Sequence, residues 1–172
     1  MSFPLYRLTL VRTDTSRRDP PKRKRAPDTR IKIPIYRVVL RKERTIRLRQ
    51  EYASNEKQAA MIAWQLIGDS PAEKLLVLLL NSQHRVVGAI VAATTSGIAS
   101  ARVEIRGIFT SAIAHNASAI ILAHNHPSGD PAPSREDLEM LDRAREASKV
   151  VGIPILDSIV VTMDPDEWRS HG

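Results

Sequence analysis

One stretch of this chain constrains its fold more than any other. The run "ASAIILA" at residues 117–123 is followed by "HNHPSGDPAP" and then, from Ser134, by a helical pattern. A short, mostly apolar run of this kind is typical of a central strand that is covered on both faces. Pro127 ends the strand, and Pro131 and Pro133 restrict the loop behind it. Such a strand needs a sheet with helices packed against it.

The rest of the chain alternates in the same way. Strand-like runs predict strands at 36–41, 75–80, 86–92 and 153–161 in addition to 117–123. Helical patterns run from a cap at Ser54 or Asn55 to about Ile67, over 103–115 and over 134–151. The second and third strands form a hairpin around 81–83. We therefore expect an α/β domain with a mixed β-sheet flanked by helices.

Two segments near the N-terminus resemble each other: "PLYRLTLVR" from Pro4 and "PIYRVVLRK" from Pro34. Both alternate apolar and polar residues, as half-buried strands do. A duplicated edge strand and a chance similarity both explain the likeness. Whether Tyr6–Arg12 joins the sheet is therefore left open.

Composition limits the kinds of site that the chain can build. The 172 residues are enough for one domain with a proper core plus an extension. The chain has no cysteine, so disulfides and thiolate metal sites are excluded, and a metal must be held by His, Asp or Glu. No apolar run approaches the roughly 18 residues of a membrane span. The N-terminus lacks the apolar core of a signal peptide, so a cytoplasmic location without membrane contact is expected.

Charge is distributed unevenly along the chain. Residues 1–49 hold 16 of the 26 lysines and arginines but only 4 of the 19 acidic residues, a surplus of 12 positive charges. The segment 17–30 is basic, proline-rich and nearly free of apolar residues, which predicts disorder. It is either a solvated linker or an arm that contacts the phosphates of nucleic acid without sequence readout. The contacts of that arm would be Arg17, Arg18, Lys22, Arg23, Lys24 and Arg25.

These patterns divide the chain into three parts. Residues 1–32 are expected to be a basic, proline-rich and partly disordered N-terminal extension. Residues 33–163 are expected to form the folded domain, and residues 164–172 a C-terminal tail.

The candidate site lies where the central strand meets the helix. His124 and His126 are two residues apart, so the strand period places both imidazoles on one side. Ser134 is a predicted helix N-cap, with Asp137 at the reciprocal capping-box position. Two neutral imidazoles, one carboxylate and an open fourth position are the ligand set of a catalytic zinc.

Each of these residues also has a simpler interpretation. A histidine near a strand end is usually a polar residue with ordinary partners, and an aspartate in a helix's first turn usually serves the helix dipole. His84 on the hairpin turn, His115 near a helix end and the terminal His171 are taken as ordinary surface residues. The spacing of His124, His126 and Asp137 together favours a metal site.

The string "HNHPSGDPAPSREDL" resembles the signature of the RadC family, a branch of the JAB/MPN (JAMM) metalloprotease-like domains. The wider JAMM pattern is an upstream Glu, then H-x-H-P, then S-x-x-D. The resemblance extends over roughly Pro34–Val161 and takes in "IPIYRVVLRKE" and "VGIPILDSIVV". It implies a JAB/MPN domain with a cytidine-deaminase-like architecture.

The resemblance implies a role for each matching residue. His124, His126 and Asp137 would bind Zn²⁺, with a water in the fourth position. Glu73, in "SPAEKLLVLLLN", matches the upstream Glu and would be the general base on that water. Ser134 would donate its hydroxyl proton to the developing oxyanion, which is compatible with its use of the oxygen as a helix cap.

The chain departs from the RadC pattern at two places. It has "VEIRG" at 103–107 where family members usually have a V-H-P-R-E-like segment. It has Ser158 after Asp157 where they usually have His. Both departures put substrate contacts or a second function in doubt.

Two functions remain open from the sequence. The first is a JAMM-type zinc metallopeptidase or hydrolase that cleaves a peptide or isopeptide bond in a protein or peptide substrate. The second is a DNA-associated accessory protein, in line with the DNA-repair label of the RadC branch. It would bind nucleic acid through its basic N-terminal arm, and its metal site would be structural or vestigial.

Overall fold

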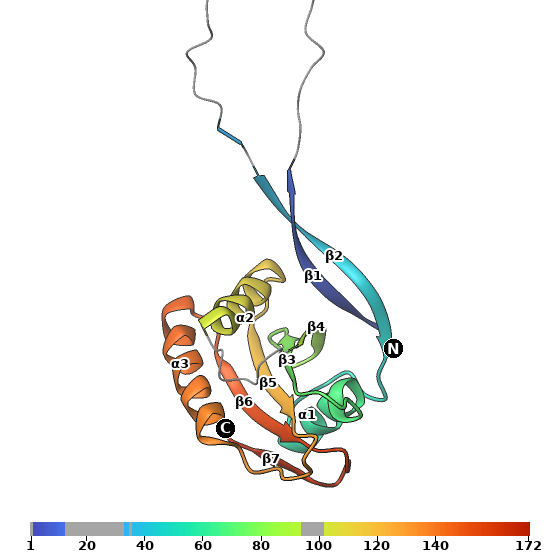
Figure 1. The fold of residues 1–172 in the computed structure, drawn as a ribbon. Helices are drawn as coiled ribbons and strands as arrows, with labels where there is room; N and C mark the ends of the chain where they lie inside the picture. The colour runs from blue at the N-terminus through green and yellow to red at the C-terminus, as the bar shows by residue number, and fades with distance from the viewer. Residues whose placement is uncertain (1, 13–32, 35, 94–101) are drawn as a thin grey trace, which may run out of the picture.

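The computed structural model describes residues 2–12, 33–34, 36–93 and 102–172 (Figure 1). They form an α/β fold with one mixed sheet whose central strands are covered on both faces, as the sequence predicts. The elements in chain order are β1 (Ser2–Arg12), β2 (Tyr36–Arg47), α1 (Glu56–Ala63), the π-helical turn η1 (Trp64–Gly68), β3 (Lys74–Leu80), β4 (Val86–Ala93), α2 (Arg102–Ala114), β5 (Ala119–Asn125), α3 (Arg135–Val151), β6 (Ile155–Val161) and β7 (Trp168–Ser170).

The described strands form one sheet in the order β2-β1-β4-β3-β5-β6-β7. β3 is antiparallel to both of its neighbours, β4 and β5, whereas β5 and β6 run parallel. Helix α3 supplies the crossover between β5 and β6, since parallel strands cannot be joined by a tight turn. The carboxyl end of β5 therefore leads directly into the loop before α3.

Strands β3 and β5 are apolar on both faces because helices cover both faces. Every residue of β5 is buried, and so is every residue of β3 after Lys74. Leu76, Leu78 and Leu80 pack on the α1 side of the sheet. Leu75, Val77 and Leu79 pack on the other side against α2 and α3. Burying each such side chain contributes about 1.5–3 kcal/mol, so these two strands anchor the domain.

Strands β1 and β2 form a long antiparallel hairpin that extends away from the body of the domain (Figure 1). They are the two segments with similar sequences, and Leu8 pairs with Leu40. β1 also lies next to β4, through a parallel pairing of Leu5 with Ala89. Tyr6–Arg12 therefore joins the sheet, a question that the sequence leaves open.

The first helix differs from its predicted form at its end. Asn55 is the N-cap, and its side chain accepts a hydrogen bond from the Gln58 amide. The predicted helix to about Ile67 changes at Trp64 into the π-helical turn η1. A Cβ at Gly68 would lie 2.4 Å from Cδ1 of Trp64, so the indole occupies the space that only glycine leaves free. The Trp64 indole in turn donates a hydrogen bond to the Met163 carbonyl (3.2 Å).

The sheet continues beyond the range 33–163 at both ends. β1 lies before it, and β7 pairs antiparallel with β6 after it, with Ser170 opposite Ile159. The proposed basic contacts between Arg17 and Arg25 lie outside the described residues, so their disorder and their role stay predictions. Among the described residues, none of the helices has the length and apolarity to cross a membrane.

Candidate metal centre

The two histidines of the candidate site follow the core face of β5. Ile120 and Leu122 point toward α2 and α3, and His124, two residues further on, continues that face. His124 is 2% exposed. His126 stands just beyond the strand, where its amide donates to the Val161 carbonyl of β6 (2.9 Å). The strand period thus brings both rings to the side of the sheet on which α3 begins.

The loop behind β5 fixes the orientation of the His126 ring. Nδ1 of His126 lies 2.8 Å from the carbonyl oxygen of Asp130. A carbonyl only accepts, so Nδ1 carries the proton and the Nε2 of the neutral ring keeps its lone pair. The loop is itself held by the Ala132 amide, which donates to the Asp130 carboxylate (2.9 Å). This pairing of a ring N–H with a backbone carbonyl is the usual support of a metal-binding histidine.

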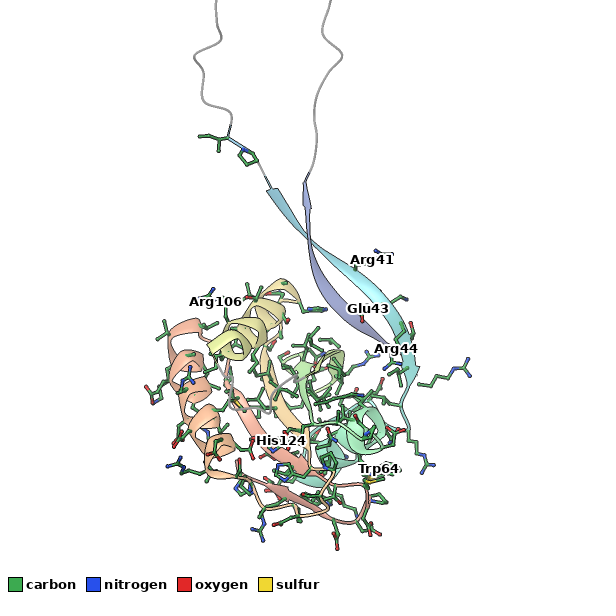
Figure 2. All side chains as sticks on the ribbon, viewed as in Figure 1. Arg41, Glu43, Arg44, Trp64, Arg106 and His124 are labelled. Atoms are coloured by element: carbon green, nitrogen blue, oxygen red, sulfur yellow. The ribbon has the colours of Figure 1, made fainter. Side chains whose placement is uncertain are left out.

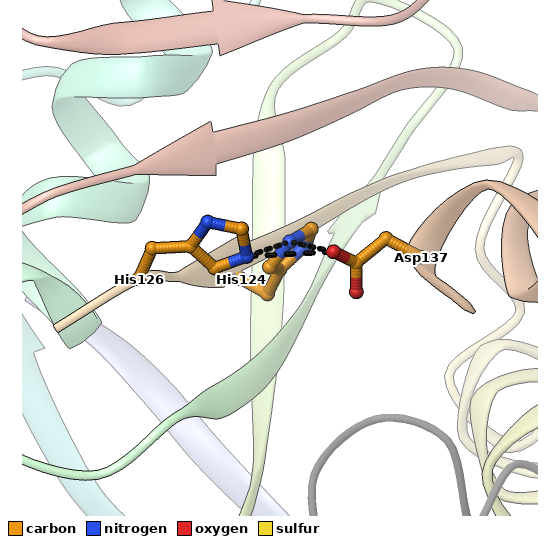
Figure 3. A group of neighbouring side chains, drawn as sticks. All are labelled: His124, His126 and Asp137. Atoms are coloured by element: carbon orange, nitrogen blue, oxygen red, sulfur yellow. Dashed lines mark hydrogen bonds and ion pairs between the residues drawn. The ribbon is translucent and has the colours of Figure 1, made fainter. Parts of the chain in front are cut away.

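The start of α3 fixes the carboxylate. Ser134 is the N-cap, and the reciprocal capping box with Asp137 is formed as predicted. The Asp137 amide donates to Oγ of Ser134 (3.1 Å), and the Ser134 amide donates to Oδ2 of Asp137 (2.7 Å). The Asp137 side chain is 6% exposed and is directed toward the end of β5 rather than into solvent (Figure 3).

Two imidazole nitrogens and one carboxylate oxygen therefore converge at one point (Figure 3). Nε2 of His124 and Nε2 of His126 are 3.1 Å apart, and each lies 3.4 Å from Oδ2 of Asp137. Donors that bind one tetrahedral zinc at about 2.0–2.1 Å lie about 3.3–3.4 Å from one another. The three separations are thus close to the edges of one face of a zinc tetrahedron.

The charges of the group suit a cation. Burial alone would raise the pKa of Asp137, but hydrogen bonds from His124, His126 and Ser134 outweigh it and hold the pKa far below its ordinary range. The pKa of His126 is raised, chiefly by its hydrogen bond to Asp137 and against the effect of burial. The buried carboxylate is therefore ionised at neutral pH, and a proton and a metal ion would compete for the same nitrogen.

A family model described as the RadC-like JAB domain matches residues 53–170. The match covers more than half of the chain and contains the whole convergent group. The chain belongs to the RadC-like JAB domain family.

Curated relatives of this RadC-like chain carry the name UPF0758 protein. One from Carboxydothermus hydrogenoformans is 41% identical over 95 residues, which are 55% of this chain and 42% of the relative. One from Geobacter sulfurreducens is 43% identical over 93 residues, which are 54% of this chain and 40% of the relative. One from Desulforudis audaxviator is 44% identical over 89 residues, which are 52% of this chain and 38% of the relative. The matched region thus spans about two-fifths of the length of these relatives.

Glu73 of this RadC-like domain lies beside the convergent group without being part of it. It immediately precedes β3, two positions before Leu75, which pairs with His124 and packs on the same side of the sheet. Its half-buried carboxylate is near enough for its charge to help raise the pKa of His126. Glu73 is therefore placed to lie near a bound metal ion without being one of its ligands.

The hydroxyl of Ser134 has a partner inside the site. Its Oγ lies 2.7 Å from Oδ2 of Asp137, and an ionised carboxylate only accepts, so the hydroxyl donates to it. The expected donation to an oxyanion would require this proton to turn away from Asp137, and it stays a prediction. In this geometry the Ser134 hydroxyl orients the Asp137 carboxylate, which faces both histidines.

The other histidines lie outside the convergent group. Among the described residues, the group that could hold a metal does not include His84, His115 or His171.

Ser158, a departure from the RadC pattern, pairs with Leu122 and so lies on the His124 side of the sheet. Asp157 instead accepts from the Ser170 hydroxyl (2.8 Å) and ties β6 to β7. Arg106 is exposed on α2.

Two residues near the site that hold the surrounding chain were not predicted from the sequence: Asp130, through its carbonyl on His126, and Asn125, which accepts from the Lys74 amide. Asp130 could not be assigned because its contribution to His126 is a backbone carbonyl, which any residue has. Asn125 did carry a signal: asparagine is unfavourable in strands, yet it stands in a fully buried one.

Proposed function

We propose that this chain is a zinc-dependent hydrolase of the JAMM type that cleaves a peptide or isopeptide bond. The observation that carries the proposal is the convergence of His124, His126 and Asp137 at separations close to those of zinc ligands. The same three residues match the H-x-H and S-x-x-D parts of the JAMM pattern. Family membership supports the assignment, since JAMM domains include metalloproteases.

The donor set fits zinc better than the hard divalent ions. Two imidazoles and one carboxylate form the three-ligand set of catalytic zinc sites, whereas Mg²⁺ and Ca²⁺ prefer oxygen ligands only. Zinc would bind through Nε2 of each histidine and Oδ2 of Asp137. When bound, it would supply a Lewis acid that lowers the pKa of water and polarises a substrate carbonyl.

The chain's own groups supply the remaining chemistry. Glu73, beside the group, would accept the proton of the attacking water and deliver it to the leaving amine. The Asp130 carbonyl would keep the His126 ring in the binding tautomer, and Ser134 would hold the Asp137 carboxylate. A Ser134 hydroxyl released from Asp137 would be able to donate to the oxyanion of the substrate.

An activity screen tests this proposal. The zinc-loaded chain is incubated with fluorogenic peptide libraries and with isopeptide-linked lysine substrates, and cleavage is followed by fluorescence. We expect hydrolysis that depends on zinc and that Glu73→Gln lowers by about 10²–10⁴-fold, the usual contribution of a general base. Equal cleavage by the wild type and Glu73→Gln, at equal zinc content, would overturn the assigned role of Glu73.

A second candidate function is nucleic-acid binding, and the β1–β2 hairpin favours it. Its described side chains on β2 include four exposed basic residues, Arg41, Lys42, Arg44 and Arg47. Figure 2 shows Arg41 and Arg44 on the ribbon, with His124 inside the body. The predicted contacts between Arg17 and Arg25 lie in the connection between the same two strands. We propose that this basic region binds phosphate backbones without sequence specificity.

A further inference from the structure

Asn125 stands between the two histidines but points away from them. Strand alternation sends His124 to the α2–α3 side of the sheet and the Asn125 side chain to the α1 side. The residue is 1% exposed, and both ends of its amide are used. A buried asparagine in a central strand needs such partners because an unsatisfied amide there is costly.

The partners of Asn125 lie in the connection between η1 and β3 and at Lys74, the first residue of β3. Oδ1 of Asn125 accepts from the Lys74 amide (2.8 Å). Its Nδ2 donates to the carbonyls of Ser70 (3.1 Å) and Ala72 (3.2 Å). The last β3–β5 backbone pair joins Leu75 to His124, so the Asn125 side chain extends the attachment beyond the end of the ladder.

These hydrogen bonds enclose Glu73. The carbonyl on its N-terminal side, from Ala72, and the amide on its C-terminal side, from Lys74, are both bound to the same side chain. The Ser70 hydroxyl closes the turn further by donating to the Ala72 carbonyl (2.7 Å). The backbone of Glu73 is thereby fixed to the strand segment that carries both histidines.

We propose that Asn125 is a positioning residue that holds Glu73 at a set place beside the His124–His126 pair. This inference rests on the proposed function, in which Glu73 is the general base. The residue between the two imidazoles thus links the base to the metal ligands through the opposite face of the sheet. Asn125 acts through the backbone of Glu73, and its side chain lies on the face of the sheet opposite the His124 imidazole.

Amide hydrogen exchange tests the positional half directly. Asn125→Leu keeps the branched shape and the number of side-chain heavy atoms but removes all three hydrogen bonds, and Asn125→Asp keeps only the acceptor. Asn81→Ala is the matched control, because Asn81 accepts from the amides of Gln83 and Arg85 at the other end of β3. We expect exchange in residues 70–74 to accelerate about tenfold or more in Asn125→Leu, with α3 unaffected. Unchanged exchange at 70–74 would overturn the proposal.

Kinetics on a cleaved peptide test the functional half. We expect Asn125→Leu to lower kcat by about 10²-fold, the effect of a small misplacement, with KM, zinc content and thermal midpoint close to those of Asn81→Ala. In a Glu73→Gln background the same substitution should have no further effect. An equal loss in that background would show that Asn125 does not act through Glu73. If exchange accelerates while Glu73→Gln itself is fully active, the positional claim stands and the role of Glu73 as general base fails. If exchange accelerates but the zinc-loaded wild type cleaves no peptide, the positional claim stands and the proposed function fails.

Discussion

Oγ of Ser134 lies 2.7 Å from Oδ2 of Asp137, the same oxygen that lies 3.4 Å from both imidazole nitrogens. One hydroxyl therefore caps a helix, through its oxygen, and orients a candidate metal ligand, through its proton. Helix stability and metal affinity are linked at this residue.

Replacing Ser134 should affect both properties. Ser134→Ala removes the N-cap, which costs about 0.5–2 kcal/mol of stability, and frees the Asp137 carboxylate to rotate. The loss of a supporting hydrogen bond should weaken zinc binding about 10–100-fold. Ser134→Thr, which keeps the hydroxyl, is the control. Competition with a zinc-sensitive dye measures the affinity, and equal values for the wild type and Ser134→Ala would contradict this role.

The pKa of His126 predicts opposite pH dependences with and without zinc. Because Asp137 raises that pKa in the folded chain, protonated His126 stabilises the metal-free fold below the ordinary histidine pKa, and this stability is lost as pH rises through the raised value. Zinc needs the neutral ring, so its affinity and the stability it adds should rise over the same range.

Thermal midpoints between about pH 5.5 and 8 measure both trends, because this range extends to either side of the unperturbed histidine pKa of about 6.5. The contribution of His126 should fall in the metal-free protein and rise in the zinc-saturated protein. His126→Asn should remove both trends. Asp137 does not contribute within this window, since its depressed pKa keeps it ionised throughout. A metal-free stability equal to that of His126→Asn at every pH would contradict the account.

Two glycines should respond oppositely to alanine. At Gly68 the added Cβ would lie 2.4 Å from the Trp64 ring, which also bonds to the Met163 carbonyl, so we expect a loss of about 1–3 kcal/mol. At Gly107, within α2, a Cβ meets no atom within 4 Å, and alanine should stabilise by about 0.5–1 kcal/mol. Urea denaturation gives both values. A Gly68→Ala protein as stable as the wild type would mean that η1 does not need this close approach.

The nucleic-acid proposal predicts a steep salt dependence. Deleting residues 1–33 would remove β1, the strand between β2 and β4, so charge neutralisation is the cleaner change. The substituted residues are Arg17, Arg18, Lys22, Arg23, Lys24 and Arg25. Replacing them with serine or glutamine should lower the magnitude of the slope of log affinity against log salt concentration by about one for each phosphate that is no longer neutralised. Fluorescence anisotropy with a labelled duplex at several salt concentrations measures it. Affinity that is indifferent to salt would count against this function.

Local patterns were sufficient for the centre of the fold and for the convergent group. The buried β5, the histidines at its end and the capping box at Ser134 are all contained in residues 117–137, where strand and helix periods fix directions. Features that depend on contacts between residues distant in sequence could not be predicted from local patterns. The π-helical turn follows from Trp64 packing over Gly68, and β7 is too short for a pattern.

Glu73 shows the same limit within the site. It lies far before His124 in sequence, and neither charge nor spacing distinguishes it from a surface residue; only the family resemblance picks it out. The structure brings it near through the pairing of β3 with β5 and the side chain of Asn125. Pairing between strands distant in sequence is a tertiary property, so no local pattern encodes it.

The most direct test of the metal centre is the zinc content and affinity of the chain with and without one of the three donors. Isothermal titration calorimetry and elemental analysis are applied to the wild type, to His126→Ala and to the control His84→Asn. Asparagine tolerates the positive φ that His84 adopts in the turn between β3 and β4. We predict one zinc per chain for the wild type and the control, and none for His126→Ala with its circular dichroism unchanged. Zinc bound equally well by folded His126→Ala would contradict the metal centre on which the proposed hydrolase depends.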